Sequence, residues 1–198
     1  MELEAQLAQY KAVVRNVFPI PEEELEAVKN VFSPASYRKG ERLLEEGQVC
    51  THLTFVNKGL FRTYLIQDGK EHVRQFMAEN SHVVEMGSFL TQSPSPFVIE
   101  ALEDSLVLRA TYEAINGLFE SSFQFMKLGK MFADQTSVNL IRRSVSLIKD
   151  DATTRYLTLL AERPFLMQRV PQYMIASYLG ITPETLSRIR KELSKSTP

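Results

Sequence analysis

A helix-turn-helix pattern near the end of the 198-residue chain limits its fold more than any other feature. In the segment VPQYMIASYLGITPETLSRIRKEL, the small Ala176 is followed by Gly180 and then by the apolar Leu186 and Ile189. A small side chain lets two helices cross closely, and glycine can take the left-handed conformation that a sharp turn requires. This spacing therefore predicts two helices joined at Gly180.

The second helix of this motif has an apolar face and a polar face. Thr182 suits the N-cap and Pro183 the first turn, while Glu184 and Arg188 lie opposite the apolar side chains. Arginine can bond bidentately to guanine and glutamate can accept from cytosine, so the pair is a candidate for base contacts. The alternative is a salt bridge on a solvated helix. The candidates for contacts to the DNA backbone are Gln172, Thr182, Thr185, Ser187 and Lys191.

The charge is unevenly distributed along the chain, whose formal net charge is -1. Residues 151–198 carry 7 Lys/Arg and 4 Asp/Glu, a net of +3, whereas residues 1–150 carry 16 and 20, a net of -4. An acidic body with a basic end is expected when only that end contacts nucleic acid. A local excess of this size is also a common fluctuation, so the charge supports the motif without proving its role.

Several classes of protein are disfavoured by what the sequence lacks. Cys50 is the single cysteine, which excludes an intrachain disulfide and a four-cysteine iron–sulfur cluster and fits a reducing cytoplasm. His52, His72 and His82 form no recognisable ligand set, so we expect no metal and no cofactor. No nucleophile–base pair or phosphate loop indicates an enzyme. No apolar run approaches the roughly 20 residues that span a bilayer.

The middle of the chain, from about Ser36 to Ala110, has the residue pattern of short strands. The runs HLTFV, LFRTYLI, HVRQFM, FVIEAL and LVLRA are rich in β-branched and aromatic residues, and turn signals separate them. Strands at this regular spacing predict an antiparallel sandwich or roll. Asp68-Gly69 is the clearest hairpin signal.

A long helix should follow the strands, because no proline occurs between Tyr112 and Lys149 and apolar residues recur with helical spacing. A compact β domain cannot cover so much apolar surface, so we expect a second copy of the chain to bury the excess. Packing along its own chain is the alternative. The expected domains are residues 1–117, the dimerisation helix 118–149 and residues 150–198, with a hinge at Asp150-Asp151. The expected dimer contacts are Met131, Phe132, Gln135, Val138 and Val145.

These segments together resemble the Crp/Fnr family of bacterial transcription regulators. ITPETLSRIRKEL looks like the family's recognition helix, and DATTRYLTLLAERP like the helix that opens its DNA-binding domain. YRKGERLLEEGQVCTHLTFVNKGLFRTY looks like the first strands of its cyclic-nucleotide-binding-type β roll. The resemblance implies an α+β fold: an N-terminal antiparallel β roll, a long dimerisation helix and a C-terminal helix-turn-helix domain with a truncated or missing wing. Where the family often has a basic residue before Glu184, this chain has Pro183.

The resemblance also implies an effector pocket, which is degenerate here. Cyclic nucleotide binders carry Gly-Glu and, further along, an Arg that neutralises the phosphate; Val84, Glu85 and Ser95 occupy these three places. A buried anion without its counter-charge is costly, so we do not expect cyclic AMP to bind. The other pocket positions implied by the resemblance are Met86, Leu140 and Ile141.

The sequence therefore predicts a cytoplasmic, homodimeric, sequence-specific DNA-binding regulator that is not an enzyme. Its expected partners are double-stranded DNA at a near-palindromic site, a second copy of the chain, RNA polymerase and an unidentified small-molecule effector, if one exists. An effector would act by shifting the spacing of the two recognition helices. The alternative is a small-molecule-binding sensor module whose helix-turn-helix serves protein contacts rather than DNA.

Overall fold

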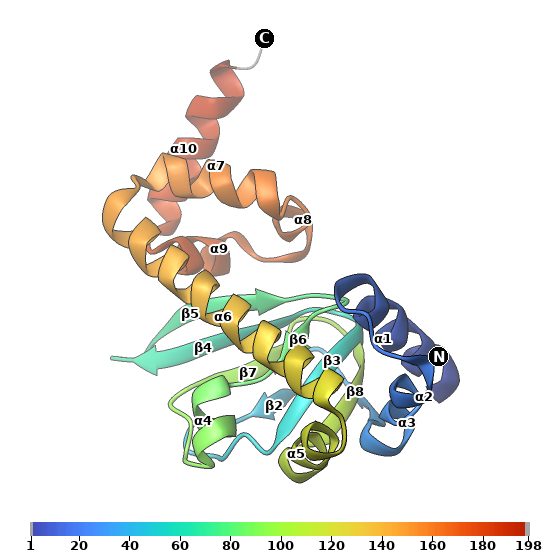
Figure 1. Ribbon diagram of the computed structural model, residues 1–198. Helices are drawn as coiled ribbons and strands as arrows, with labels where there is room; N and C mark the ends of the chain where they lie inside the picture. The colour runs from blue at the N-terminus through green and yellow to red at the C-terminus, as the bar shows by residue number, and fades with distance from the viewer. Residues whose placement is uncertain (1, 197–198) are drawn as a thin grey trace. The chain divides into compact units, whose positions relative to one another are not determined.

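The computed structural model describes residues 2–196, which divide into two compact units (Figure 1). Of these residues, the first unit comprises 2–65 and 75–133, and the second comprises 66–74 and 134–196. The boundary falls inside the long helix, between Ala133 and Asp134, rather than at the expected positions on either side of residues 118–149.

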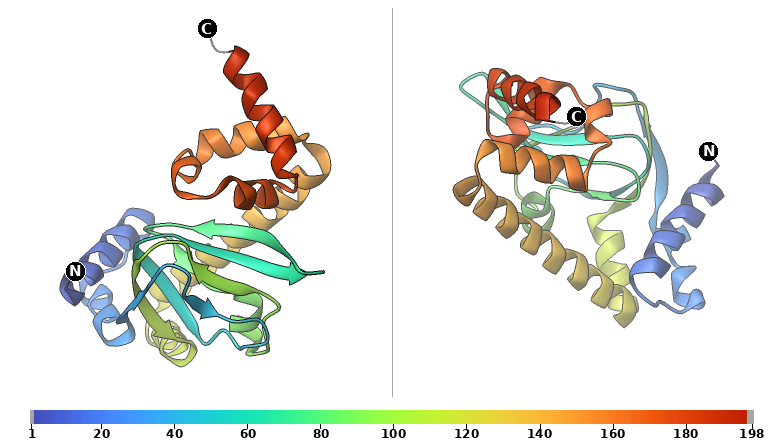
Figure 2. Two further views of the ribbon diagram at one scale, coloured as in Figure 1. Left: turned by 180° about the vertical axis from the view of Figure 1, so that it is seen from behind. Right: turned by 90° about the horizontal axis from the view of Figure 1, so that it is seen from above.

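The first unit contains an antiparallel β roll of two four-stranded sheets, as expected for an α+β fold (Figure 2). One sheet has the order β1-β8-β3-β6 and the other β2-β7-β4-β5, with the short helix α4 (Met86–Thr91) between β6 and β7. The strands are β1 (Ser33–Tyr37), β2 (Arg42–Leu44), β3 (His52–Lys58), β4 (Phe61–Gln67), β5 (Lys70–Met77), β6 (His82–Val83), β7 (Val98–Ala101) and β8 (Ser105–Thr111).

The predicted hairpin between β4 and β5 is confirmed. Asp68 and Gly69 both have positive φ, at 52° and 71°. Two successive residues of this kind form the tight turn whose twist matches that of paired strands.

Three helices precede the roll: α1 (Leu3–Val17), α2 (Glu22–Leu25) and α3 (Val28–Val31). The buried face of α1 lies against β3, where the ring of Tyr10 meets that of Phe55 at 5.0 Å between centroids. The Asn57 side chain on β3 donates to the Gln6 carbonyl (3.0 Å) and to the Gln9 side-chain oxygen (3.1 Å). These contacts fix α1 to one face of the first sheet.

His82 lies in an aromatic enclosure on this same face. Its ring is 5.6 Å from that of Phe55, 6.1 Å from that of Tyr10 and 4.8 Å from that of Phe132. Burial lowers the pKa of His82 from 6.5 to about 4, because an imidazolium cannot be hydrated there.

Acid should therefore destabilise the first unit through His82. As pH falls below 6.5, the unfolded chain takes up this proton before the folded chain does, so stability is lost between pH 6.5 and about 4. We expect about 1–2 kcal/mol of this loss by pH 5. Urea unfolding at pH 7 and pH 5 measures it: His82→Phe should flatten the pH dependence, whereas exposed His72→Phe should not. Equal slopes for the wild type and His82→Phe would contradict the assignment.

The long helix begins later than the sequence indicates. Residues from 118 onwards belong first to α5 (Tyr112–Ser121), and α6 runs over Phe123–Lys149. Ser122 is extended and its hydroxyl accepts from the Phe125 N–H (3.1 Å), which ends one helix and starts the next. Gly129 lets α6 cross α5 closely, because a Cβ there would lie 2.5 Å from the Phe119 ring.

The second unit combines the later part of α6 with four further helices and the tip of the β4–β5 hairpin. The helices are α7 (Ala152–Glu162), α8 (Leu166–Arg169), α9 (Gln172–Leu179) and α10 (Pro183–Ser196). Residues 134–196 contain no strand. At the hairpin tip, the Ser177 hydroxyl of α9 donates to the Glu71 carbonyl (3.0 Å) and accepts from the Val73 N–H (2.9 Å).

The turn at Asp150-Asp151, which the sequence suggests as a hinge, is held by specific contacts. The Asp151 carboxylate accepts from the Thr154 N–H (2.7 Å) and caps α7. Arg155 then donates to the Asp150 carbonyl (2.5 Å) and to the Leu179 carbonyl at the end of α9 (2.9 Å). Motion at this turn would have to break these bonds, and its role as a hinge stays a prediction.

Candidate nucleic-acid interface

The turn of the helix-turn-helix has the predicted geometry. Gly180 ends α9 in the left-handed conformation, with φ 67° and ψ 37°. The Gly180 N–H donates to the Ser177 carbonyl (3.1 Å) and the Ile181 N–H to the Ala176 carbonyl (3.0 Å), so the last carbonyls of α9 are satisfied. Ala176 is fully buried, which allows the close helix crossing that its size predicts.

The recognition-type helix α10 is oriented by its cap and by its apolar face. The Thr182 hydroxyl accepts from the Thr185 N–H (3.2 Å), which confirms Thr182 as the N-cap. Leu186 and Ile189 are buried against α9 and the rest of the unit. The opposite side of α10 is thereby turned outward.

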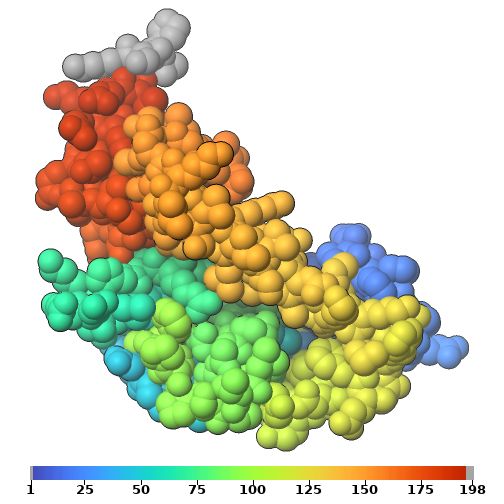
Figure 3. Space-filling view, turned by 60° about the vertical axis from the view of Figure 1, so that its left-hand side comes forward, coloured from blue at the N-terminus to red at the C-terminus, as the bar shows by residue number. Residues whose placement is uncertain are grey.

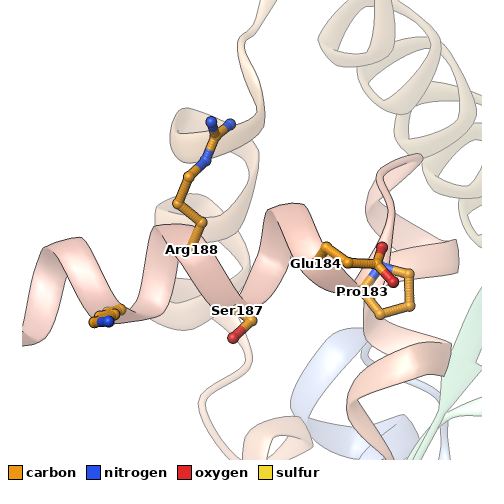
Figure 4. Close-up of a pocket in the computed structure, with 5 residues that line it drawn as sticks. Pro183, Glu184, Ser187 and Arg188 are labelled. Atoms are coloured by element: carbon orange, nitrogen blue, oxygen red, sulfur yellow. The ribbon is translucent and has the colours of Figure 1, made fainter.

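That outward side is a polar face, and we use "α10 face" for the five residues that line a shallow open hollow there (Figure 4). They are Pro183, Glu184, Ser187, Arg188 and Lys191. The Arg188 side chain extends away from the helix, whereas the Glu184 carboxylate turns back beside Pro183 (Figure 4).

Glu184 and Arg188 make no ion pair in the described residues, so the salt-bridge alternative is not realised here. The pKa of Glu184 is lowered, first by a hydrogen bond from its own backbone N–H and second by one from the Thr182 side chain. The carboxylate therefore stays charged at neutral pH and lies at the positive end of α10. The Arg188 guanidinium remains free to meet an external acceptor.

The predicted phosphate contacts are spread over α9, the turn and α10, and Ser187 and Lys191 belong to the α10 face. Gln172, Thr182, Ser187 and Lys191 are exposed, whereas Thr185 is half-buried and bonds to Thr182. The sequence interpretation missed two exposed residues of the same motif, Tyr173 at the start of α9 and Arg190 on α10. A count of every polar or aromatic residue outside the buried stripe would have found both.

Part of the positive charge in this unit serves internal structure. Arg143 of α6 donates to the Tyr178 carbonyl (2.7 Å) and its guanidinium lies 4.1 Å from the centre of the Tyr178 ring. Arg155 bonds the adjacent Leu179 carbonyl. Both arginines stabilise the negative end of the α9 dipole. Of the two, Arg155 is counted in the net charge of +3 of residues 151–198, so that figure overstates the charge that α10 presents.

In the degenerate effector cassette, the polar side chains form hydrogen bonds within the segment itself. Glu85 is buried and caps α4 by accepting from the Ser88 N–H (2.7 Å). Ser95 is buried, and its hydroxyl accepts from the Phe97 N–H (3.0 Å) and donates to the Phe97 carbonyl (3.2 Å). Met86 is half-buried beside Glu85 in sequence. Neither polar group carries the positive charge that a phosphate needs.

The segment before β3 closes on this cassette. The Gly47 N–H donates to the Ser95 carbonyl (2.8 Å), and the Cys50 N–H donates to the Ser88 hydroxyl (2.8 Å). Cys50 is buried, and burial raises the pKa of its thiol, which disfavours the reactive thiolate. These observations fit a small residue of the core.

The later part of α6 lies at the surface (Figure 3), and it carries a stripe of exposed apolar side chains. Val138, Ile141, Val145 and Ile148 follow each other at spacings of three, four and three residues, the pattern of a coiled-coil contact. Ile141 and Ile148 are 64% and 85% exposed. Leu140 is also exposed, so neither predicted pocket residue of α6 is covered by its own chain.

The other predicted dimer contacts differ from this stripe. Met131 and Phe132 are half-buried, and the Phe132 ring packs on His82 within the first unit. Gln135 is exposed and bonds to the Asn139 side chain (3.0 Å). The helical spacing of these residues is compatible with a dimer contact, but the Phe132 side chain is already packed against the first unit of its own chain.

The comparisons with known proteins agree with this architecture. Residues 34–122 match the model of the cyclic nucleotide-binding domain. Among solved structures, FixK2 from Bradyrhizobium japonicum has a TM-score of 0.73 at 21% identity, covering 84% of this chain and 86% of that one. No curated protein matches the sequence.

Two further structures extend the likeness. A protein from Eubacterium rectale assigned to the Crp/Fnr family of transcriptional regulators has a TM-score of 0.69 at 16% identity, covering 92% of this chain and 87% of that one. A CooA mutant from Carboxydothermus hydrogenoformans has a TM-score of 0.66 at 21% identity, covering 85% and 79%.

The fold therefore defines a class: a cyclic nucleotide-binding-type roll followed by a long helix and a helical C-terminal unit. More specifically, this fold is similar to that of solved regulators such as FixK2 and the Crp/Fnr-family protein from Eubacterium rectale, so the resemblance seen in the sequence is confirmed at the level of the fold. In the described residues no helix is both long and apolar enough to cross a membrane.

Proposed function

We propose that the chain is a homodimeric transcription regulator of the Crp/Fnr type that reads a near-palindromic DNA site with α10. The observation that carries this proposal is the α10 face, which presents Glu184, Ser187, Arg188 and Lys191 outward on a helix whose opposite side is buried. A helix of this width fits the major groove, where base edges are exposed.

Each side chain of the α10 face has a task in this proposal. Arg188, extended and without an ion pair, donates bidentately to a guanine. Glu184, charged at the start of α10, accepts from a cytosine amine. Ser187 and Lys191 meet phosphate oxygens and fix the register. Pro183 offers no donor, so base contacts on that side of Glu184 are fewer than in relatives with a basic residue there.

The exposed stripe of α6 supports the dimer. A second copy would bury Val138, Ile141, Val145 and Ile148, which are costly to leave in water. Two-fold symmetry then gives two recognition helices, which read half-sites roughly 34 Å apart, one turn of DNA. Through such a site the dimer would act on transcription by RNA polymerase.

Salt dependence separates DNA reading from protein contacts by the same motif. In the proposal, phosphate contacts release counterions, so the logarithm of the binding constant falls linearly with that of salt concentration. A gel shift on genomic fragments between low and physiological salt measures this slope. Retention that does not change with salt would favour the rival function, a sensor whose helix-turn-helix binds protein.

Cyclic AMP should not stabilise this protein. Ser95 offers no positive charge to the phosphate, and Glu85 is already bonded within the cassette. Thermal unfolding with millimolar cyclic AMP should match a control with the same concentration of chloride. A rise of several degrees in Tm over that control would show that the roll binds the nucleotide after all.

A further inference from the structure

Two neighbouring polar side chains inside the roll carry buried atoms that make no hydrogen bond to any residue the structure describes. Strand pairing places Thr54 of β3 directly opposite Arg109 of β8. Side chains alternate between the two faces of a strand. Because Phe55 and Asn57 face α1, Thr54 and Arg109 lie on the opposite face of the sheet.

That opposite face is turned toward the second sheet. Tyr37 of β1 lies on it, since the register pairs Ser33 with Arg109 and residues two apart share a face. The Tyr37 ring meets Phe61 of β4 edge-on at 5.8 Å. Thr54 and Arg109 therefore belong to the interior between the sheets.

Both side chains carry buried polar atoms that make no hydrogen bond. Thr54 is completely buried, and its hydroxyl oxygen has no partner among the described residues. The Arg109 Nε is buried without a partner as well, and its guanidinium forms no ion pair with a described carboxylate. Arg62 of β4 differs in one respect: its Nε is also buried without a hydrogen bond, but another nitrogen of its guanidinium pairs with the Glu100 carboxylate at 2.8 Å.

Two of the titratable groups near Arg109 are neutral. Burial lowers the pKa of His52, and the nearby Arg109 lowers it further, so this imidazole stays neutral. Burial likewise keeps the Cys50 thiol protonated. Glu85, the acidic residue of the adjoining cassette, has one carboxylate oxygen bonded to the Ser88 N–H.

Buried donors without acceptors are rare in folded proteins because the lost hydration is not replaced. A hydroxyl and a guanidinium side by side offer several N–H and O–H donors and one positive charge. That set is complementary to an oxyanion, which guanidinium groups bind through paired hydrogen bonds.

We propose that Arg109 and Thr54 form a binding site for a small oxyanion, a carboxylate or a phosphate, inside the roll. Arg109 donates to the anion and balances its charge, and the Thr54 hydroxyl donates a further hydrogen bond. The positive charge is thus supplied by β8 and not by the cassette, in which Ser95 occupies the place of the phosphate-binding arginine. Anion binding at this site requires no DNA, so its test is independent of the test of the proposed function.

Thermal unfolding of the full chain tests the site with three probes: succinate, inorganic phosphate and AMP, each at constant ionic strength adjusted with chloride. The matched variants are Arg109→Leu and Arg38→Leu, since Arg38 is an exposed arginine of the same unit. At least one probe should raise the Tm of the wild type and of Arg38→Leu in a saturable manner, by several degrees at concentrations far above Kd. The responding probe distinguishes the carboxylate from the phosphate.

Arg109→Leu should lose this response and, without ligand, should unfold at a temperature no lower than the wild type. Thr54→Val keeps the shape of the side chain and should weaken binding about threefold to tenfold by calorimetry. Two results would overturn the proposal: no probe acts beyond the chloride control, or Arg109→Leu responds as strongly as the wild type. Either would mean that water satisfies these groups.

Discussion

Val145→Asp in α6 is expected to separate the dimer into monomers at micromolar concentration. Val145 lies in the middle of the exposed stripe, and two-fold symmetry places an aspartate from each copy at the same contact. Burying unpaired carboxylates costs several kcal/mol, so the dimer Kd should rise by at least about 100-fold, or about 3 kcal/mol. Sedimentation velocity over a range of concentrations measures the change.

Asn139→Asp is the matched control for this prediction. It places the same charge on α6 away from the stripe, where Asn139 is exposed and accepts a hydrogen bond from Gln135. This variant should sediment as the wild type does. If Val145→Asp remains a dimer, or if the wild type is a monomer, α6 does not join the copies through this stripe.

Arg188→Ala is expected to lose base discrimination while the fold remains intact. The side chain is exposed, so its removal leaves the packing of Leu186 and Ile189 unchanged. The loss of a bidentate contact to guanine should cost about 1–3 kcal/mol at one position of each half-site. Competition binding with single-base variants of the site locates that position.

Two further variants separate base reading from simple charge. Arg188→Lys keeps the positive charge but loses the planar pair of donors, so it should discriminate nearly as poorly as Arg188→Ala. Arg190→Ala removes an exposed charge of α10 outside the α10 face and should weaken all sequences equally. An unchanged base preference in Arg188→Ala would remove Arg188 from the reader.

The helix-turn-helix was predictable because its constraints are local. Ala176 must be small at a helix crossing, Gly180 must adopt positive φ, and Thr182 must cap the next helix, and each requirement acts within a few residues. The same holds for the Asp68-Gly69 hairpin. Local rules of this kind leave a direct trace in the sequence.

The features that the sequence did not show depend on tertiary contacts. The break at Ser122 falls within a continuous helical pattern, and only the bond of its hydroxyl to Phe125 reveals the new helix start. The unpartnered Arg109 became visible only when the β3–β8 register set it beside Thr54. Likewise, the exposure of Ile141 on α6 follows from how the helix packs, and its assignment to a pocket stays a prediction.

Selection of bound DNA from a random pool tests the central claim most directly. The account predicts enrichment of one near-palindromic sequence whose two halves are centred about one helical turn apart. A parallel selection with Arg188→Lys should relax the preference at one position of each half and keep the spacing. No enriched sequence, or the same enriched sequence with Arg188→Lys, would contradict reading of DNA by the α10 face.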